Sequence, residues 1–338
     1  MRIAINGFGR IGKNFLRTIM LDPAALHGLD VAVINIGPAD KEYVGLFFKY
    51  DTIMGHYPGT VEQRGSTLII DGKSIEIIQE LDPLQCPWKK MSIDWVVDCS
   101  GKFTTRAGAE KHLKAGAGAV LISAPAKDED ISIVPGVNES LYKKSNHKIV
   151  SLGSCTTNAF CTMLKVLHDE LTVESGYMTT VHSYTNSQAL LDLPMDAKDP
   201  RRSRAAALNI VPTSTGAARM VDIIFPELKG KINASAVRVP VGNVSLVDFV
   251  FSAKKNASVK QLNDLFMLAA TTSLKGIVDV ATEPLVSSDF IGDAASVIID
   301  TLSTSANGPL MHVAGWYDNE WGYSSRMKDF LLFIKGMA

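Results

Sequence analysis

Residues 2–12, with the sequence RIAINGFGRIG, decide the fold of this chain. The first part is a short, mostly apolar run typical of a buried strand, and the glycines after it have the spacing G-x-G-x-x-G. A helical pattern follows over residues 14–21. Between a strand and a helix, Gly7 permits a tight turn, Gly9 lets a pyrophosphate approach the backbone, and Gly12 lets the helix pack on the strand. The stretch predicts a dinucleotide-binding unit, with packing of a glycine-rich turn as the alternative.

Strand and helix patterns alternate from there to residue 152. A helical pattern covers residues 107–115, and Asp71-Gly72 is a hairpin turn signal. The apolar runs that predict further buried strands are residues 30–35, 96–99, 119–123 and 148–152. The alternation predicts an α/β fold with a doubly wound, mostly parallel sheet of the Rossmann type.

The character of the sequence changes after residue 153. Long alternating strand patterns cover residues 232–238 and 244–253. A chain of 338 residues is also too long for one ordinary core. We therefore expect two domains. The first is a dinucleotide-binding domain over residues 1–153, onto which a C-terminal helix of about residues 319–338 packs back. The second is an α+β catalytic domain over residues 154–318 with a largely antiparallel sheet.

Bulk composition limits the classes of function. The hydrophobic fraction of 46% and the charged fraction of 20% describe a folded globular protein, and a formal net charge of −1 argues against nucleic acid as a partner. The four cysteines lack paired C-x-x-C spacing and no H-E-x-x-H motif occurs, so we expect neither a disulfide framework nor a metal site. We find no signal peptide and no apolar run of about 18 residues, which predicts a cytoplasmic protein without a membrane partner.

Cys155 is a candidate nucleophile. It follows the strand pattern of residues 148–152, and Ser154 is a natural N-cap for a helix whose apolar residues recur at three-to-four spacing from Phe160. In the first helical turn, unpaired N–H groups and the helix dipole favour a thiolate, and cysteine pKa values fall from about 8.5 to roughly 3.5–7.5. We therefore expect a lowered pKa at Cys155. The alternative is a small buried hydrophobic residue, the common fate of free cysteines.

His182 ends the strand pattern of residues 177–182 and is a candidate base, although a single histidine at a strand end is more often a surface or packing residue. A reactive cysteine, a histidine and a dinucleotide fold together predict oxidation of an aldehyde. The thiolate would add to the aldehyde, and hydride transfer to the nicotinamide would leave a thioester, which water or phosphate then attacks. Side chains suited to holding phosphate favour the second outcome. They are Ser154, Thr156, Thr185, Arg202, Thr215 and Arg238.

A series of motifs along nearly the whole chain resembles the phosphorylating glyceraldehyde-3-phosphate dehydrogenase family. They are NGFGRIG at residues 6–12, SCTTN at 154–158, HSYTN at 182–186, TGAA at 215–218, RVP at 238–240 and WYDNEWGY at 316–323. The resemblance implies an oxidoreductase for oxidative phosphorylation of D-glyceraldehyde 3-phosphate to 1,3-bisphosphoglycerate, with NAD or NADP as cofactor, in glycolysis or gluconeogenesis. It also implies a homotetramer, in which the loop of residues 183–205 lines a neighbouring subunit's cofactor site.

The resemblance implies roles for single residues. Cys155 would be the nucleophile and His182 the base that activates it. The residues implied at the cofactor are Gly7, Gly9, Arg10, Ile11 and Gly12 at the pyrophosphate, Ile36 on the adenosine side, and Ser123 and Asn319 at the nicotinamide half. The residues implied at phosphates are Ser154, Thr156, Thr215 and Gly216 in one site, and Thr185 and Arg238, with Arg202 nearby, in the site for the substrate's own phosphate.

Three positions depart from the family pattern. Ile36 stands where the family has an acid that holds the adenosine ribose, and an aliphatic side chain neither accepts a hydrogen bond from a 2′-hydroxyl nor repels a 2′-phosphate. Leu81 replaces the usual arginine, and Ala159 replaces a frequent second cysteine. Asp40 could stand in for the acid or cap the helix that begins near Lys41. NAD and NADP therefore both stay open as cofactors.

Two other functions fit parts of the pattern. The related dehydrogenase of erythrose 4-phosphate also resembles this chain, although Tyr184-Thr185-Asn186 and the phosphate residues favour the glyceraldehyde enzyme. A nucleotide-binding regulator that has lost catalysis is the alternative from another class. The presence of Cys155, His182 and Arg238 together argues against it, since a binding module needs no such trio. The direction in which a cell runs the reaction is not specified by the sequence.

Overall fold

The computed structural model describes residues 1–194 and 199–337. The chain divides into two compact units, which are Met1–Gly153 with Ser324–Ala338, and Ser154–Tyr323. Residues 195–198 of the predicted 183–205 loop, and the last residue of the predicted C-terminal helix, lie outside the described residues. The two units are described separately below.

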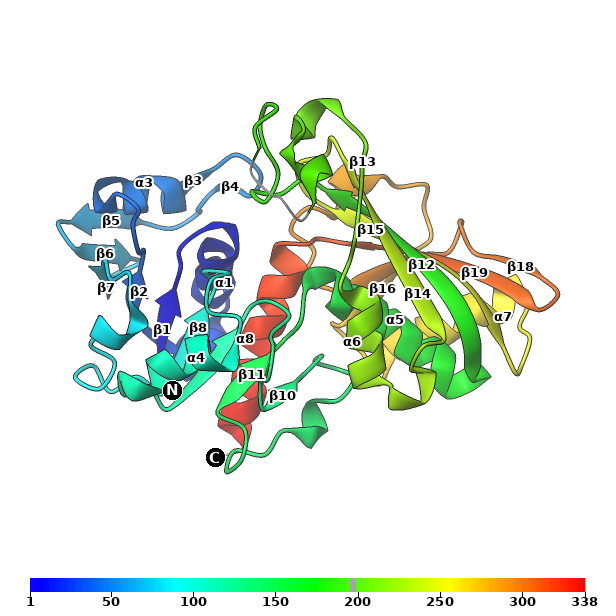
Figure 1. Ribbon diagram of the computed structural model, residues 1–338, viewed down its shortest axis with the longest axis horizontal. Coiled ribbons are helices and arrows are strands. Elements are labelled where there is room, and N and C mark those ends of the chain that lie inside the picture. The colour runs from blue at the N-terminus through cyan, green and yellow to red at the C-terminus, as the bar shows by residue number, and fades with distance from the viewer. Residues whose placement is uncertain (195–198, 338) are drawn as a thin grey trace. The chain divides into compact units, whose positions relative to one another are not determined.

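The first unit contains a nine-stranded sheet with the order β10-β11-β9-β8-β1-β2-β7-β6-β5 (Figure 1). β1 pairs in parallel with β2 on one side and with β8 on the other, so the strand order reverses between β1 and β8. Sheets of this kind bind ligands outside the carboxyl ends of the strands at that point. The strands are β1 (Arg2–Asn6), β2 (Asp30–Asn35), β5 (Val61–Arg64), β6 (Thr67–Ile70), β7 (Lys73–Ile78), β8 (Trp95–Asp98), β9 (Ala119–Ile122), β10 (Ile131–Ser132) and β11 (Ile149–Ser151).

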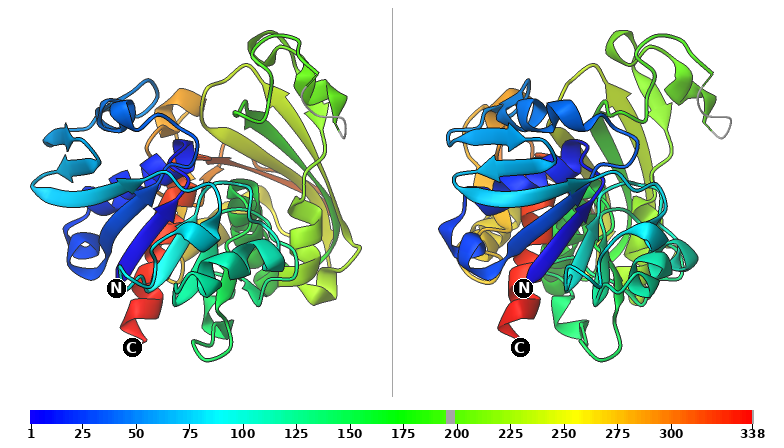
Figure 2. Two further views of the ribbon diagram at one scale, coloured as in Figure 1. Left: turned by 60° about the vertical axis from the view of Figure 1, so that its left-hand side comes forward. Right: turned by 90° about the vertical axis from the view of Figure 1, so that its left-hand side faces the viewer.

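Helices and a hairpin complete this unit. β6 and β7 form the predicted hairpin, where Asp71 and Gly72 have φ of 48° and 80°. The remaining elements are α1 (Arg10–Met20), α2 (Pro23–Gly28), α3 (Val44–Lys49), β3 (Tyr50–Asp51), β4 (Gly55–His56) and α4 (Arg106–Lys114). The last helix, α8 (Trp321–Gly336), lies along this sheet from Ser324 onward, and its described end lies close to the N-terminus (Figure 2). Phe330 of α8 packs edge-on against Trp95, with ring centroids 6.3 Å apart.

The second unit contains an eight-stranded mixed sheet with the order β13-β14-β12-β15-β19-β17-β16, and β18 pairs with β19. Most of its pairs are antiparallel, but β12 pairs with β14 and β16 with β17 in parallel. The strands are β12 (Val173–Ser183), β13 (Val211–Thr213), β14 (Ile232–Val239), β15 (Ser245–Ala253), β16 (Val278–Ala281), β17 (Val297–Asp300), β18 (Ser305–Asn307) and β19 (Leu310–Tyr317). The helices are α5 (Cys155–Leu171), α6 (Ala217–Ile224) and α7 (Val259–Thr271).

The burial pattern explains how this sheet is covered. Residues of β15 alternate between buried and half-buried along the whole strand, as expected for a sheet with one face in the core. The long helix α5 covers that face; its Phe160 packs edge-on against Phe249 of β15, with ring centroids 4.9 Å apart. The two sheets confirm the predicted fold class. None of the helices in the described part of the chain is both long and apolar enough to span a membrane.

Candidate active site

The start of α5 positions Cys155. Gly153 has a φ of +62°, a conformation that glycine adopts at little cost, and it turns the chain from β11 into the helix. Ser154 is the N-cap, because its hydroxyl accepts a hydrogen bond from the backbone N–H of Thr157 at 3.1 Å. Cys155 is therefore the first helical residue, as predicted, and its side chain keeps part of its surface exposed.

His182 lies beside this cysteine. It is the penultimate residue of β12, and its Nε2 is 3.6 Å from the Cys155 sulfur. The histidine side chain is almost fully buried, with 4% of its surface exposed. A nucleophile and a base within hydrogen-bond reach form the basic unit of covalent catalysis. The structure thus brings together the two residues that the sequence suggested for this chemistry.

The carbonyl group of Ser183 orients the imidazole. It lies 2.7 Å from His182 Nδ1 and also accepts a hydrogen bond from Arg238 Nη1 at 2.8 Å. A carbonyl oxygen has two lone pairs and can accept from both donors. The two neighbours of Nδ1 favour different tautomers, because the Ser183 carbonyl accepts from a protonated Nδ1 whereas Arg238 Nη1, 2.7 Å away, donates to a lone pair there. A proton on Nδ1 leaves a lone pair on Nε2 facing the cysteine, which is the form that a base for Cys155 requires.

Strand pairing brings Arg238 to the same place. β12 and β14 pair in a parallel register that sets His182 opposite Arg238, and the guanidinium Nη1 is 2.7 Å from His182 Nδ1. Burial, and then the neighbouring positive charge, lower the pKa of His182 to about 3, so the imidazole is neutral at pH 7. The Nε of Arg238 is a buried donor without a partner among the described residues. Such a group fits an anionic ligand.

The pKa of Cys155 differs from the sequence prediction. Burial raises the pKa of this thiol above its ordinary value, because the surrounding protein replaces the water that would solvate a thiolate. The charge of Arg238 and the backbone N–H of Thr156 act in the opposite direction without cancelling the effect. The prediction of a lowered pKa was therefore wrong. It counted the helix start and omitted the desolvation.

Tyr317 is a residue of this site that sequence reasoning missed. Its hydroxyl hydrogen-bonds to Thr156 at 2.9 Å and to Thr180 at 2.8 Å, and so ties the start of α5 to β12. Its ring lies edge-on to the His182 ring, with centroids 6.0 Å apart. The sequence signal for Tyr317 was its place in the WYDNEWGY motif. It is the last residue of β19, and its side chain is buried.

Asn319 has a fixed amide. Its Oδ1 accepts hydrogen bonds from Ser183 Oγ at 2.8 Å and from Ser245 Oγ at 2.9 Å. Asp318 before it accepts the backbone N–H groups of Glu320 and Trp321, at 2.9 and 2.8 Å, and so caps the start of α8, which lies within the predicted range. Because the amide oxygen is committed, the Asn319 nitrogen faces the opposite direction. Ser183 thus contacts both His182 and Asn319.

The remaining candidate phosphate residues make local contacts. Arg202 donates from Nε to the Thr213 hydroxyl at 2.9 Å and lies near enough to lower the pKa of His182 by its charge. The Thr185 hydroxyl bonds to that of Ser187 at 2.9 Å. The Thr215 hydroxyl accepts the Ala217 N–H at 3.2 Å, beside Gly216, the N-cap of α6. The contacts of Thr185 and Thr215 do not link them to Cys155.

In the first unit, the three glycines of the motif have different surroundings. A Cβ built on Gly7 would lie 2.6 Å from the backbone of Ser100, and one on Gly12 would lie 2.2 Å from the carbonyl of Gly7. A Cβ on Gly9 would meet nothing within 4 Å. Packing therefore explains glycine at the first and third positions. At Gly9 the space left open at the start of α1, beside Arg10 and Ile11, fits the close approach of a ligand.

A buried polar network supports the carboxyl edge of this sheet and was also missed. Trp88 donates to His112 Nδ1 at 3.1 Å, so His112 Nε2 carries the proton that it shares with Asp98 at 3.1 Å. Asn6 donates to the same carboxylate at 3.0 Å and accepts from Asn35 at 2.7 Å. Asn35 Oδ1 in turn accepts the backbone N–H groups that follow β2 and β7. The network holds these loops in place.

The adenosine-side candidates lie on those loops. Ile36 follows β2, is 6% exposed and donates its N–H to the Ile78 carbonyl at 3.0 Å. Leu81 is 68% exposed. Asp40 accepts the Glu42 N–H at 2.9 Å and caps a short 3₁₀ helix, which confirms the capping interpretation. Ser123 follows β9, where its N–H bonds to the Asp98 carbonyl at 3.0 Å. Directly after β2, where the family has an acid, this chain thus has the apolar side chain of Ile36.

In residues 1–194 and 199–337, no group of three or more His, Cys, Asp or Glu side chains is arranged to hold a metal ion.

Comparison with known proteins identifies the family. Residues 1–106 match the glyceraldehyde 3-phosphate dehydrogenase NAD binding domain, and residues 154–319 match the C-terminal domain of the same family. The chain is 49% identical over 336 residues to the glyceraldehyde-3-phosphate dehydrogenase of Priestia megaterium, covering 99% of this chain and 98% of that protein. It is 47% identical to glyceraldehyde-3-phosphate dehydrogenase 1 of Bacillus subtilis and 46% identical to the enzyme of Geobacillus stearothermophilus, with the same coverage. The chain belongs to the glyceraldehyde 3-phosphate dehydrogenase family of NAD(P)-dependent oxidoreductases.

Proposed function

We propose that this protein oxidises D-glyceraldehyde 3-phosphate to 1,3-bisphosphoglycerate, with Cys155 as nucleophile and His182 as base. The observation that carries the proposal is the 3.6 Å separation of the Cys155 sulfur and His182 Nε2, with Arg238 beside them. A nucleotide-binding regulator needs no such arrangement.

Each proton has a place in this mechanism. Cys155 adds through sulfur to the aldehyde carbon, and its thiol proton passes to His182 Nε2. The imidazole, charged for the moment, is stabilised by the Ser183 carbonyl 2.7 Å from Nδ1. The imidazolium gives this proton to the new oxyanion, which becomes the thiohemiacetal hydroxyl. His182 takes the hydroxyl proton back as hydride leaves the same carbon for the cofactor, which gives a thioester on Cys155. A phosphate oxygen attacks the thioester, the acyl phosphate departs, and the sulfur regains a proton from His182.

We propose that two groups of residues hold the phosphates. Arg238, with its unpartnered buried Nε, and Thr185 would hold the phosphate of the substrate, with Arg202 nearby. The residues proposed for the attacking phosphate are Ser154, Thr156, Thr215 and Gly216. Their hydroxyls and helix starts are suited to anions.

Arg238→Leu should raise KM for the aldehyde phosphate and lower kcat/KM by about a hundredfold, because a charge-assisted contact is lost. It should also raise the pKa of both Cys155 and His182. The positive charge of Arg238 stabilises the Cys155 thiolate and destabilises the His182 imidazolium, so it lowers both pKa values, and its removal reverses both effects. The pH dependence of Cys155 alkylation by neutral iodoacetamide measures the first shift, and kinetics measure the loss. Arg238→Lys is the control that keeps the charge. An unchanged alkylation profile in Arg238→Leu would contradict this account.

The cofactor would lie at the carboxyl edge of the first sheet. We propose that Gly7, Gly9, Arg10, Ile11 and Gly12 hold its pyrophosphate. Ile36 would face the adenosine ribose, and Ser123 and Asn319 the nicotinamide half. The open space at Gly9 is the feature of this structure that fits the group. When bound, the cofactor accepts the hydride.

Gly9→Ala should weaken NAD binding about tenfold or more and leave folding unchanged, because the new methyl group occupies only the space where the pyrophosphate approaches. Gly12→Ala should instead lower the free energy of unfolding by about 2–4 kcal/mol, since its Cβ would lie 2.2 Å from the Gly7 carbonyl. NAD titration and urea unfolding of both variants separate the two effects. Wild-type NAD affinity in Gly9→Ala would show that no pyrophosphate lies there.

We propose that Ile36 permits the use of NADP. Its side chain offers no hydrogen-bond acceptor to a ribose diol and no charge to repel a 2′-phosphate. The values of kcat/KM for NAD and NADP should lie within about a hundredfold of each other, and Ile36→Asp should shift the ratio toward NAD by about tenfold or more. An NAD preference above a hundredfold in the unchanged protein would refute this prediction.

We also propose that the first unit is the cofactor domain and the second the catalytic domain of a homotetramer. Apolar side chains are exposed around the loop of residues 183–205, including Leu190 at 81% and Leu191 at 68%, as expected for a surface that another subunit covers. Sedimentation analysis should give four copies of the 36.5 kDa chain. A cytoplasmic location fits a catalytic thiol and free cysteines.

A direct test of the function is the dependence on phosphate. Purified protein should reduce NAD or NADP steadily only when both glyceraldehyde 3-phosphate and inorganic phosphate are present. The value of kcat/KM should be higher for glyceraldehyde 3-phosphate than for erythrose 4-phosphate. Steady reduction without phosphate, or a preference for the four-carbon aldehyde, would contradict the proposal.

A further inference from the structure

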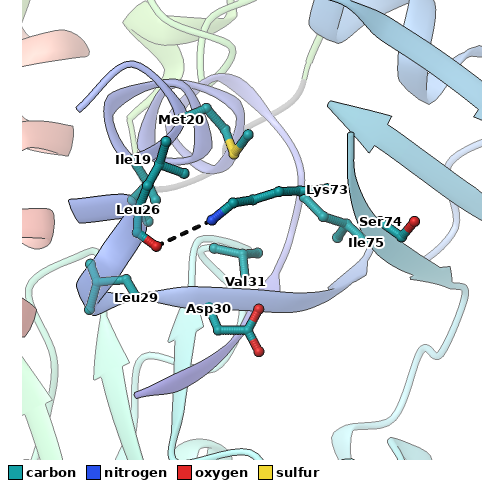
Figure 3. A pocket seen from close by; sticks show the side chains of 9 residues that line it. All are labelled: Ile19, Met20, Leu26, Leu29, Asp30, Val31, Lys73, Ser74 and Ile75. Atoms are coloured by element: carbon teal, nitrogen blue, oxygen red, sulfur yellow. Dashed lines mark hydrogen bonds between the residues drawn. The ribbon is translucent and has the colours of Figure 1, made fainter. Parts of the chain in front are cut away.

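Two cavities open at the amino edge of the first unit's sheet, where its strands begin. The smaller cavity, of about 240 Å³, lies between α1, α2 and the starts of β2 and β7 (Figure 3). Lys73 Nζ donates across it to the carbonyl of Leu26 at 3.2 Å, so its one lysine already has a partner. We do not propose a ligand for this cavity, because its lysine is already paired. Lys73 serves below in the control variant.

The larger cavity, which we call the amino-edge pocket, has a volume of about 570 Å³. It is lined by the chain start, the first residues of β8 and β9, the segment before β11, and the last turn of α8. A volume of several hundred Å³ is typical of small-molecule sites. The proposed cofactor site lies at the opposite, carboxyl edge of the same sheet, so the two are separate.

Cations dominate the lining of the amino-edge pocket. Its lining residues include Met1, Lys144, Lys148 and Lys335, all with exposed or half-exposed surfaces, against one acidic residue, Asp94. In the part of the chain that the structure describes, none of these three lysines forms an ion pair. The excess is local, because the chain as a whole has a formal net charge of −1.

The single carboxylate is already engaged. Asp94 Oδ2 accepts the backbone N–H of Arg2 at 2.7 Å. The Met1 amino group donates to the Gly28 carbonyl at 3.2 Å, which keeps this charge at the rim. The unpaired lysines therefore favour an anion at this pocket.

Tyr142 offers the amino-edge pocket a hydrogen-bond donor on a rigid frame. Only 4% of its surface is exposed, and its ring packs against Trp95 and Phe330, with centroids 6.3 and 5.5 Å away. Its hydroxyl makes no hydrogen bond with the described residues and is reached by solvent, so water or a ligand can accept from it. The residue lines the amino-edge pocket, so a donor held by a rigid aromatic cluster is available to a ligand there.

We propose that the amino-edge pocket is a second binding site, for a small polyanion of the polyphosphate class. Lys144, Lys148 and Lys335 would neutralise its charge, and the Tyr142 hydroxyl would donate one directed hydrogen bond. The volume admits two or three phosphate groups with a small organic substituent. The inference stands independently of the proposed dehydrogenase reaction, because it uses none of the same residues.

Calorimetric titration of the NAD-saturated protein tests this site. The probes are inorganic tripolyphosphate, ATP and fructose 1,6-bisphosphate, which separate a bare polyphosphate, a nucleotide and a sugar phosphate. The triple variant Lys144→Gln/Lys148→Gln/Lys335→Gln should bind the best probe at least about tenfold more weakly, and Tyr142→Phe about three- to tenfold more weakly. The control Lys73→Gln/Lys254→Gln/Lys275→Gln changes the net charge equally and should bind like the unchanged protein. Thermal unfolding monitors the fold of each variant.

Other results would overturn the proposal. Binding that NAD displaces, or that Arg238→Leu abolishes, would place the anion at the cofactor or substrate site. Equal weakening in both triple variants would indicate a general effect of charge. No measurable binding of any probe would also show that the site does not exist.

Discussion

Replacing Cys155 by serine should lower kcat by at least about a thousandfold, because a serine hydroxyl is a far weaker nucleophile than a thiol at neutral pH. The substitution exchanges one atom at the partly exposed first residue of α5, where Ser154 still caps the helix. Folding and cofactor binding should therefore be unchanged. Steady-state kinetics with glyceraldehyde 3-phosphate, and NAD titration of the same sample, measure both expectations.

Cys161 offers a matched control in the same helix. It is fully buried, and burial raises the pKa of its thiol to about 12, so it is inert. Cys161→Ala should keep kcat within about threefold of the unchanged enzyme, since it lies outside the reacting groups. A loss of less than tenfold in Cys155→Ser, or a comparable loss in Cys161→Ala, would refute the proposed nucleophile.

Replacing His182 by asparagine should lower kcat/KM by about 10²–10⁴-fold at pH 7, the usual contribution of a general base. Asparagine can still donate to the Ser183 carbonyl, but nothing then faces the Cys155 sulfur as an acceptor. The thiol must ionise unaided, and burial raises its pKa.

The rate deficit of His182→Asn should depend on pH in a defined direction. In the unchanged protein the pKa of His182 is lowered to about 3, so the imidazole is neutral and able to accept a proton from about pH 5 upward. In His182→Asn the rate should rise with pH as hydroxide forms the thiolate, so the deficit should narrow between about pH 7 and about pH 10. Kinetics over this range provide the measurement. A deficit that is constant with pH would indicate a purely structural role for His182.

Local patterns were sufficient for several elements of the fold. The strand of residues 30–35, the Asp71-Gly72 hairpin and the helix that begins at Cys155 all appear as predicted. Each depends on residues close together in the sequence, where periodicity, turn chemistry and capping act. The position of His182 opposite Arg238 depends on a parallel pairing between distant strands, which no local pattern specifies.

Long-range packing also explains what the sequence did not reveal. Tyr317 reaches Thr156 across 161 positions of sequence, and Asn6 reaches Asp98 across 92. The raised pKa of Cys155 has the same origin, because desolvation depends on how the surrounding chain folds over the thiol. The helix start, which is visible in the sequence, is only one of the contributions to the pKa of Cys155.

The formation of a thioester on Cys155 is the central claim, and a single-turnover measurement tests it most directly. Enzyme mixed with glyceraldehyde 3-phosphate and oxidised cofactor, without phosphate, should produce one equivalent of reduced cofactor per chain and then almost stop. Mass spectrometry should find the acyl group on Cys155, and added phosphate should release it as an acyl phosphate. Reduction without a burst, or an acyl group on another residue, would contradict the account.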